Sequence, residues 1–388
     1  MNIKTLLSGL FYKLFRLINS FFLKSEKNIV IHSKPDYCDM TRAILNYFSK
    51  SAQVNVYILT CETKTKIPLW LTYGNVHIMP KYSIKGIYMY FTSKYCFFTI
   101  GLFSRINPLK SQVAVNIWHG MPIKVIGYDY AGSRHVPNFT YTISTSCFFQ
   151  KIIANSFNVN ENKVLNTGLP RNDLLFNNTS NLKDILGFRK YNKIIYWLPT
   201  YRDLKYNEQE TKNHGLAGIT GLDDLDLKEL SEFLLKENIL CVFKPHPLSN
   251  FVEERGNGSI DNILVINNDW MNERGTSLYE MLSITDILIT DISSVYVDFL
   301  LRDKPIIFSF PDKDEYLKTR GTYFDDLDSA LAGPIVTTMS DMIKHINLIL
   351  NGSDFYKEKR KKMLSQFHDG KVEACYTENL IKALAAVK

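Results

Sequence analysis

The sequence predicts two α/β units, each built on a parallel sheet with helices on both faces, preceded by an amphipathic helix. The chain has 388 residues, which is too long for one ordinary domain and suits two of about 100–200 residues each. After residue 28, short apolar runs alternate with amphipathic helical patterns, as in parallel sheets with crossover helices. The alternation stops in a polar stretch at 173–192 and then restarts. We therefore expect one unit over 29–180 and another over 181–388, facing a cleft that binds a nucleotide-type ligand.

The composition is that of a globular protein with a moderate excess of positive charge. Hydrophobic residues make up 45% and charged residues 22%, which excludes disordered and fibrous chains. Lys and Arg exceed Asp and Glu by 46 − 39 = 7, which favours anionic partners such as phosphates or lipid headgroups. The charge is dispersed apart from the chain ends, whereas a nucleic-acid binder needs a localised basic stripe. We expect no nucleic-acid partner.

Several familiar site patterns are absent from the sequence. The six cysteines are widely spaced without a Cys-x-x-Cys pair, which argues against disulfide scaffolds and zinc knuckles and favours a reducing compartment. The Walker-like spacing from Gly127 to Gly132 continues with Ser133-Arg134 and so lacks the phosphate-binding lysine. No Gly-x-Gly-x-x-Gly or His-Glu-x-x-His occurs. We expect no metal ligands and no cofactor; the sequence leaves a Mg²⁺ requirement open.

Residues 1–28 predict a helix with an apolar half and a basic half. Apolar side chains from Leu6 to Phe22 share one half of a helical projection, and Lys13 and Arg16 lie on the other. Because these two charges interrupt the apolar run, the segment does not predict a membrane span. We expect it to lie in the headgroup layer of an anionic membrane. The alternative is a helix that docks on the protein's own core.

The remaining elements follow from the periodicity of apolar residues. The first unit has predicted strands at Asn28–Ser33, Val54–Leu59, Val76–Met79, Cys96–Ile100, Ala114–Trp118 and Tyr141–Ser144, and helices at Met40–Ser49 and Cys147–Phe157. The second has predicted strands at Lys193–Leu198, Ile239–Phe243, Ile263–Ile266, Ile287–Thr290 and Ile306–Phe308, and helices at Leu227–Glu237, Ser277–Leu282, Val295–Leu301 and Ser340–Leu350. A long basic segment ending near Ala386 is predicted as the last helix, crossing back to the first unit.

Two predicted strands end in loops that carry a histidine and a cation. The first continues into His119 and Gly120, followed by Lys124, and a histidine suits proton transfer near neutral pH. The second continues into Lys244-Pro-His246-Pro, in which the prolines restrict the loop and Lys and His suit a phosphate group. A structural histidine in a tight turn and a rigid surface loop are the respective alternatives.

A third strand ends at Thr290 and is followed by Asp291, Ser293 and Ser294. Either serine suits the cap of the next helix, and free N–H groups at a helix start bind phosphate. An ordinary N-cap is the alternative. Arg171 and Arg202 each lie near a proline around the predicted boundary and suit bidentate phosphate contacts, or serve as surface arginines of hinge loops.

Together these segments resemble the CDP-glycerol glycerophosphotransferase family of teichoic acid and capsule polymer synthesis. The matching segments keep the family order over about residues 29–375: Ser33–Arg42, Trp118–Lys124, Gly168–Asp173, Pro199–Arg202, Lys244–Pro247, Thr290–Ser294, Asp303–Phe308, Arg320–Asp325, Gly333–Val336 and Asp369–Lys371. Met121 stands where the family usually has Thr, and Leu169 where it has Tyr or Phe.

The resemblance implies a GT-B-like fold and transfer of glycerol phosphate from CDP-glycerol to a hydroxyl of a lipid-linked or growing polymer, with release of CMP. It implies peripheral attachment at the cytoplasmic face of the bacterial membrane. His119 is the implied general base, with His246 as a second catalytic residue. The implied donor-binding residues are Thr200, Arg202, Lys244, Thr290, Asp291, Ser293, Ser294 and Arg320. The implied acceptor or accessory residues are Asp39, Arg42, Gly120, Lys124, Asp129 and Arg171.

Three alternatives remain at this point. A ribitolphosphotransferase using CDP-ribitol would share the scaffold, and a GT-B glycosyltransferase would use a nucleotide sugar instead. A membrane-bound scaffold with a dead site is the non-enzymatic alternative, against which His119, Lys244 and His246 argue. The sequence leaves open the acceptor, the oligomeric state and whether the chain adds one unit or polymerises many.

Overall fold

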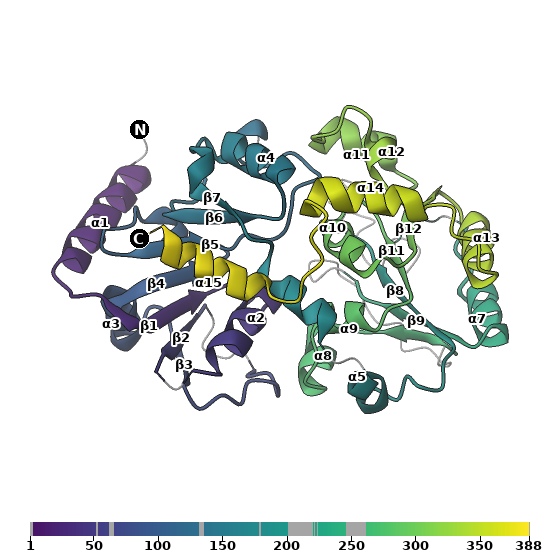
Figure 1. Ribbon diagram of the computed structural model, residues 1–388, viewed down its shortest axis with the longest axis horizontal. Helices are drawn as coiled ribbons and strands as arrows, with labels where there is room; N and C mark the ends of the chain where they lie inside the picture. The colour runs from purple at the N-terminus through teal and green to yellow at the C-terminus, as the bar shows by residue number, and fades with distance from the viewer. Residues whose placement is uncertain are drawn as a thin grey trace. The chain divides into compact units, whose positions relative to one another are not determined.

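The chain folds into two compact α/β units, each with its own parallel sheet (Figure 1). The structure is a computed structural model that describes residues 3–51, 53–61, 66–131, 136–177, 180–200, 220, 222, 224–245 and 261–387. Unit 1 comprises Met1–Met121, Ile126–Leu174 and Glu373–Lys388, and unit 2 comprises Pro122–Val125 and Leu175–Val372. The change of unit thus falls at 174/175 rather than at 180/181, and the chain returns to unit 1 for its last helix.

Unit 1 contains a seven-stranded sheet in the order β3-β2-β1-β4-β5-β6-β7, with every pair parallel. Its strands are β1 (Ser25–His32), β2 (Asn55–Thr60), β3 (Val76–Pro80), β4 (Ser93–Phe98), β5 (Val113–Asn116), β6 (Tyr141–Ser144) and β7 (Val164–Asn166). Its helices are α1 (Ile3–Ser20), α2 (Asp39–Phe48), α3 (Ile84–Thr92), α4 (Cys147–Phe157) and α15 (Tyr376–Ala386), with 3₁₀ turns η1 (Leu102–Arg105), η2 (Gly127–Asp129) and η3 (Glu161–Lys163). The strand order reverses between β1 and β4.

Unit 2 contains a six-stranded parallel sheet in the order β10-β9-β8-β11-β12-β13. Its strands are β8 (Lys193–Leu198), β9 (Ile239–Phe243), β10 (Ile263–Val265), β11 (Ile287–Thr290), β12 (Ile306–Ser309) and β13 (Ile335–Val336). Its helices are α5 (Ser180–Ile185), α7 (Leu227–Lys236), α8 (Asn268–Glu273), α9 (Leu278–Ser283), α10 (Val295–Phe299), α11 (Lys313–Arg320), α12 (Leu327–Ala330), α13 (Met339–Leu350) and α14 (Lys357–His368). The 3₁₀ turn η4 (Pro170–Phe176) spans the change of unit, and η5 (Leu300–Arg302) continues α10. Here the order reverses between β8 and β11.

The strands form where the sequence has nearly continuous apolar runs, because both faces of a parallel sheet are covered. All five residues of β9 are buried, as are all four of β11. Trp197 of β8 packs edge-to-face on Phe243 of β9 within the core of unit 2. This dense core holds the strand ends, from which the loops with the predicted site residues leave.

The main differences between the predicted and observed elements lie in the first helix, the C-terminal segment and two short strands. The first helix ends at Ser20 rather than at 28, because residues from Ser25 onward pair with β2 and β4 as β1. The C-terminal basic segment forms two helices, since Asp369 and Gly370 adopt positive φ angles of 52° and 70° and end α14. The short strands β7 and β13 were not predicted, because three and two residues show too little periodicity.

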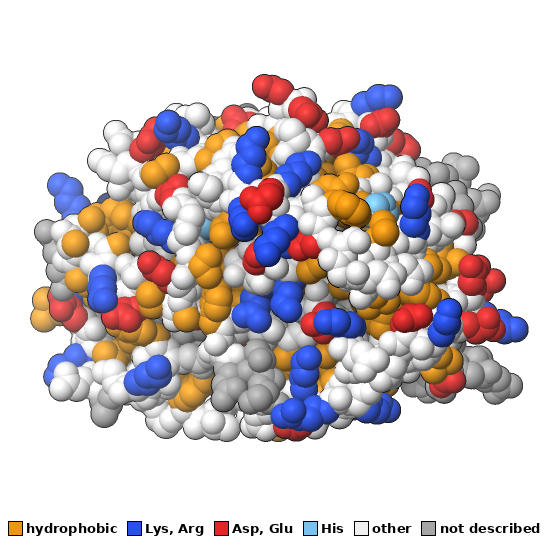
Figure 2. All heavy atoms as spheres, turned by 45° about the vertical axis from the view of Figure 1, so that its right-hand side comes forward, with side chains coloured by type: hydrophobic (Ala, Val, Ile, Leu, Met, Phe, Trp, Pro, Cys, Tyr) orange, Lys and Arg blue, Asp and Glu red, His pale blue; other side chains and the backbone are white. Residues whose placement is uncertain are grey.

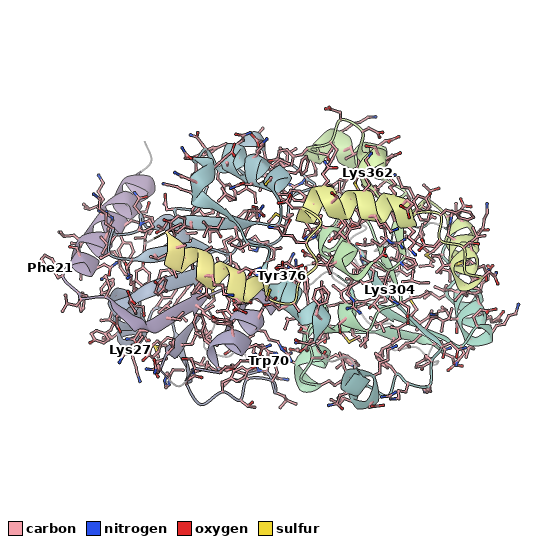
Figure 3. All side chains as sticks on the ribbon, viewed as in Figure 1. Phe21, Lys27, Trp70, Lys304, Lys362 and Tyr376 are labelled. Carbon is pink, nitrogen blue, oxygen red and sulfur yellow. The ribbon has the colours of Figure 1, made fainter. Side chains whose placement is uncertain are left out.

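Helix α1 packs on the rest of unit 1 mainly through Phe15 and Asn19. Phe15 is 7% exposed and packs against the rings of Tyr90 and Phe91, while the Asn19 side chain donates to Gln112 Oε1 at 2.6 Å. Exposed apolar side chains of the helix and the turn after it include Leu10, Phe11, Leu14, Leu17, Ile18 and Phe21. Figure 3 shows Phe21, which is 78% exposed, at the outer end of α1. Among the described residues, no helix combines the length and apolar character that crossing a bilayer requires.

Gly168 provides a test of how α15 is held on unit 1. Its φ is +77°, and a Cβ there would lie 2.2 Å from the ring of Tyr376 at the start of α15. We expect Gly168→Ala to speed amide hydrogen exchange throughout α15. Gly187→Ala is the control, because Gly187 has a similar φ of +69° with open space around a Cβ. Both changes carry the cost of about 1–2 kcal/mol for a left-handed residue, so equal exchange in α15 would show that the Tyr376 contact is unimportant.

Candidate active site at the carboxyl ends of the strands

His119 follows β5 in a turn that projects it outward. Asn116, the last residue of β5, accepts a hydrogen bond from Trp118 N at 3.2 Å. Trp118 adopts a φ of 50°, which is uncommon for a bulky residue, and its ring packs on Phe157 at 4.9 Å. Gly120 follows with a φ of 128°. The turn is therefore held on both sides of His119, and it leaves the His119 side chain exposed.

Arg171 contacts the His119 residue and shifts its protonation. The Arg171 guanidinium donates to the His119 carbonyl oxygen at 2.8 Å. Although part of the His119 side chain stays accessible to solvent, nearby protein atoms desolvate its ring, and this desolvation lowers the pKa of His119 below the ordinary 6.5. The positive charge of Arg171 is the second cause of the lower pKa. His119 is therefore neutral at physiological pH, with a ring nitrogen able to accept a proton. This is the protonation state that a general base needs.

The segment that carries Arg171 also anchors the end of the chain. The Asp173 carboxylate accepts hydrogen bonds from the N–H groups of Tyr376 at 2.6 Å and Thr377 at 3.0 Å, the first residues of α15. Burial nevertheless raises the pKa of Asp173, and these hydrogen bonds oppose the rise. Within one short segment, Arg171 acts on His119 and Asp173 holds α15.

In unit 2, predicted donor-binding residues meet at the end of adjacent strands. Asp291, which is 1% exposed, accepts hydrogen bonds at 2.9 Å from both the N–H and the hydroxyl of Thr200. Thr290 Oγ1 donates to the Leu198 carbonyl at 2.8 Å and joins the ends of β11 and β8. These contacts lie where the strand order reverses, which is where ligands bind in open α/β sheets.

Lys244 extends this group to β9. Its backbone N–H donates to the Trp197 carbonyl at 3.0 Å, and its side chain is 6% exposed. An ammonium group in such surroundings interacts with a phosphate more strongly than it would in bulk water. The described part of unit 2 therefore gathers Lys244, Thr200, Thr290 and Asp291 along one edge of the sheet.

The two serines before α10 differ from the predicted cap. Ser294 is the N-cap residue, but its side chain makes no capping hydrogen bond. Ser293 Oγ instead accepts from Val295 N, at a long 3.4 Å. The helix itself is short and continues as the 3₁₀ turn η5. Ser293 and Ser294 follow Asp291 by two and three positions, and their contact with a donor phosphate stays a prediction.

Lys124 and Arg320 belong to unit 2, where the segment that contains Lys124 pairs with the loop that follows Arg320. Pro122–Val125 pairs with the loop after α11: Lys124 forms an antiparallel bridge with Thr322, whose hydroxyl donates to the Ile123 carbonyl at 2.9 Å. Lys124 Nζ donates to Tyr316 Oη at 2.9 Å. Arg320 is the exposed last residue of α11. The predicted motif that begins with His119 is therefore divided between the units.

The other predicted accessory residues lie in unit 1 with separate contacts. Arg42 is buried in α2, with its guanidinium 4.8 Å from the ring centre of Trp70, which Figure 3 labels. Asp39 begins the same helix. Asp129 accepts a hydrogen bond from Ser156 of α4 at 2.7 Å. Arg202 and His246 lie outside the described residues.

Sequence reasoning missed a group formed by His32, Asp36, Cys61 and Lys81. These residues follow the ends of β1, β2 and β3, which are neighbours in the sheet. Asp36 lies in the family segment Ser33–Arg42, but His32, Cys61 and Lys81 belong to no motif. The four residues could have been grouped only by predicting that these strands lie side by side.

The comparisons with known proteins agree with this arrangement. A family model described as CDP-Glycerol:Poly(glycerophosphate) glycerophosphotransferase matches residues 14–375. A teichoic acid poly(glycerol phosphate) polymerase of Bacillus spizizenii is 26% identical over 97% of this chain and 95% of its own. A teichoic acid glycerol-phosphate transferase of Staphylococcus aureus is 23% identical over 98% and 99%. A teichoic acid poly(ribitol-phosphate) polymerase of B. spizizenii is 31% identical over 67% of this chain, which spans 42% of that protein.

Among solved structures, the wall teichoic acid polymerase TagF superposes with a TM-score of 0.77 at 20% identity, over 97% of this chain and 92% of that one. This likeness and the two doubly wound sheets confirm the predicted GT-B-like fold. Fold and site together define a two-domain transferase. The chain belongs to the CDP-glycerol glycerophosphotransferase family. As a member it is a glycerophosphotransferase-type enzyme of teichoic acid biosynthesis.

The influence of Arg171 on His119 predicts a measurable titration. The His119 imidazole should titrate below 6.5 in the intact protein, and Arg171→Gln should raise its pKa, because one of the two causes of the shift is removed. Arg171→Lys is the matched control that keeps the charge and should keep the low pKa. NMR of the imidazole carbons against pH, with His119→Gln for assignment, measures this. An equal pKa in wild type and Arg171→Gln would contradict the electrostatic role.

Proposed function

We propose that the enzyme transfers glycerol phosphate from CDP-glycerol to a hydroxyl group of a lipid-linked or growing polymer and releases CMP. The observation that carries the proposal is that the candidate base lies in unit 1 and the candidate phosphate-binding residues lie in unit 2. Unit 1 presents an exposed, neutral His119, and unit 2 places Lys244, Thr200 and Asp291 where its strand order reverses. His119 suits the role of proton acceptor, and the residues of unit 2 suit the binding of a nucleoside diphosphate.

In the proposed reaction, the acceptor oxygen attacks the β-phosphorus of CDP-glycerol. The bond from that phosphorus to the bridging oxygen breaks, CMP leaves with the electron pair, and His119 takes the hydroxyl proton. Because the transferring phosphoryl group carries its charge on oxygen atoms, positioning and charge stabilisation supply most of the catalysis. The buried ammonium of Lys244 supplies such stabilisation in unit 2.

Thr200 and Asp291 have different parts in this proposal. The Asp291 carboxylate receives two hydrogen bonds from Thr200 and so fixes the direction of the loop after β8. A carboxylate repels phosphate directly, and we therefore assign Asp291 to positioning Thr200 rather than to contact with the donor phosphates. Arg202 and His246, on the loops after β8 and β9, remain proposed donor-binding and catalytic residues on the strength of the family motif.

CDP-ribitol is the second candidate donor, because similar relatives include ribitol-phosphate polymerases as well as glycerol-phosphate enzymes. Two relatives that this chain matches over at least 95% of their own length are named for glycerol phosphate, which favours glycerol, whereas a ribitol-phosphate primase of B. spizizenii is matched over 61% of its length. The ribitol relative is more than twice as long as the part that this chain matches. A direct comparison of the two donors separates these candidates.

We also propose that α1 attaches the enzyme to an anionic membrane surface, where a lipid-linked acceptor would lie. Its exposed apolar side chains, from Leu10 to Phe21, recur at helical spacing on the side that unit 1 does not cover. Lys13 and Arg16 are exposed on the same helix and suit anionic headgroups. Figure 2 shows Lys, Arg, Asp and Glu side chains together over another face.

Acceptor-dependent CMP release tests the reaction. Purified enzyme is given CDP-glycerol or CDP-ribitol with a lipid-like acceptor, and product mass is measured. We expect His119→Ala to lower turnover by about 10²–10⁴-fold, as for loss of a general base, while donor affinity stays near wild type. Lys244→Met should instead raise the dissociation constant of the donor by about 10- to 100-fold, as for loss of a charge-assisted hydrogen bond.

Lys193→Met is the control for Lys244→Met, because it removes the same charge at the amino end of β8, away from the proposed site. Loss of donor binding in His119→Ala would remove His119 from the role of base. No CMP release with either donor across several acceptors would overturn the reaction, and a screen of nucleotide sugars would follow.

Vesicle binding tests the role of α1. Leu17→Glu and Phe21→Glu should each weaken co-sedimentation with phosphatidylglycerol vesicles on the order of tenfold, because each removes an apolar side chain from the interface and adds a negative charge. Phe355→Glu, at a similarly exposed apolar residue of unit 2, is the control. Equal loss of binding in all three variants, or none in any, would show that α1 is not the attachment site.

A further inference from the structure

Four side chains in unit 1 converge where the strand order reverses, and the proposed transfer reaction uses none of them. His32 ends β1, Asp36 lies in the loop that follows, and Cys61 and Lys81 come directly after β2 and β3. The reversal lies between β1 and β4, and Thr99 after β4 donates its N–H to the His32 carbonyl at 3.2 Å. Ligands of open α/β sheets bind at this position.

The His32 ring is oriented with one nitrogen available to a ligand. His32 is fully buried, and its Nδ1 lies 2.7 Å from the Leu59 carbonyl oxygen, an acceptor that requires the proton on Nδ1. Nε2 is then the unprotonated nitrogen, and it lies 3.8 Å from Cys61 Sγ. A backbone carbonyl that fixes the opposite ring nitrogen in this way is the usual support of a metal-binding histidine.

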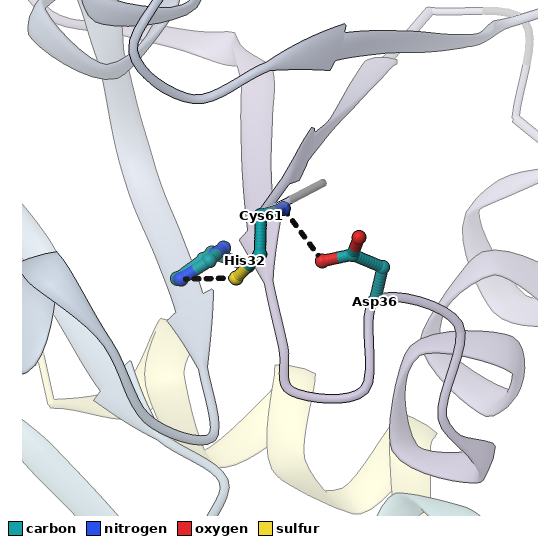
Figure 4. Close-up of side chains that lie close together, drawn as sticks. All are labelled: His32, Asp36 and Cys61. Atoms are coloured by element: carbon teal, nitrogen blue, oxygen red, sulfur yellow. Dashed lines mark hydrogen bonds between the residues drawn. The ribbon is translucent and has the colours of Figure 1, made fainter. Parts of the chain in front are cut away.

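Asp36 completes a set of three different donor atoms. Its carboxylate accepts a hydrogen bond from Cys61 N at 2.7 Å, which holds the loop after β1 against the end of β2 (Figure 4). The nitrogen of His32, the sulfur of Cys61 and a carboxylate oxygen of Asp36 all lie within 4.8 Å of one another. Around tetrahedral zinc, nitrogen and sulfur ligands are about 3.6 Å apart, close to the 3.8 Å between Nε2 and Sγ.

Two neighbours show that this space suits a cation. Lys81 Nζ lies 3.3 Å from Cys61 Sγ and 3.5 Å from His32 Nε2, so an ammonium group already contacts both atoms. Nζ also lies 4.8 Å from the ring centre of the exposed Tyr82, which offers the flexible side chain an outward position. Gly101 leaves room on the ring, since a Cβ there would lie 2.3 Å from Nε2.

We propose that His32, Asp36 and Cys61 bind a zinc ion, for which the ammonium of Lys81 is the competing occupant. Imidazole nitrogen, thiolate sulfur and carboxylate oxygen are the ligands that zinc takes in proteins, and a water or substrate oxygen would fill the remaining position. Binding breaks the S–H bond of Cys61, releases its proton to solvent and displaces Lys81 outward. The ion would join the loops after β1 and β2 at the edge of the sheet that also carries His119.

Cobalt binding to the full-length protein tests this proposal. The protein is stripped with a chelator and titrated with Co²⁺, which gives a thiolate-to-metal absorption band only when a cysteine is a ligand. Zinc affinity is measured by competition with a chromophoric chelator. We expect one Co²⁺ per chain with this band. Cys61→Ser should abolish the band, and Asp36→Asn should weaken zinc binding on the order of tenfold or more.

Two further variants separate this site from other thiols and from loss of folding. Cys147→Ser changes an exposed cysteine of the same unit and should keep the band. Lys81→Met should tighten metal binding, because it removes the competing charge, and circular dichroism checks that each variant is folded. Absence of the band in wild type, or its persistence in folded Cys61→Ser, would overturn the site. Weaker metal binding in folded Lys81→Met would show that the Lys81 ammonium group does not compete with the metal ion.

Discussion

In both units every strand pairs in parallel with its neighbours, and this constraint places the chemistry. Because the strands share one direction, the loops that leave their carboxyl ends meet along one edge of each sheet. Where the strand order reverses, successive loops diverge and leave space for a ligand. In unit 2 the hydrogen bonds from Thr200 to Asp291 span the reversal between β8 and β11. In unit 1, His32 occupies the equivalent position beside β4.

The sequence is most informative where burial is most complete. Runs such as Lys193–Leu198, Ile239–Phe243 and Ile287–Thr290 form strands with the predicted bounds, because a strand covered on both faces has to be apolar throughout. The ends of α1 and α14 were less predictable. The residues after α1 resemble the helix in composition, but from Ser25 onward they pair in the sheet. The basic segment continues after α14, but the positive φ angle of Asp369 ends that helix.

The motifs named candidate site residues one at a time, but they did not predict the contacts between them. The motifs indicated Thr200 and Asp291 separately, yet their hydrogen bond joins residues 91 positions apart. The contact of His32 with Cys61 spans 29 positions, and that of Cys61 with Lys81 spans 20. Such contacts depend on strand order, which periodicity alone does not determine. A motif also does not show that its residues have different contacts. Arg171 contacts His119, whereas Asp173, two residues later, accepts hydrogen bonds from the first amides of α15.

The contact of Asp173 with Tyr376 has a consequence for the order in which the protein is completed during synthesis. The two residues are 203 positions apart, and nearly the whole of unit 2 lies between them in the chain. A ribosome makes Asp173 long before it makes Tyr376, so all strands of unit 1 are synthesised before α15. Unit 2 is thus an insertion within unit 1, and the first unit to be synthesised is the last to be finished.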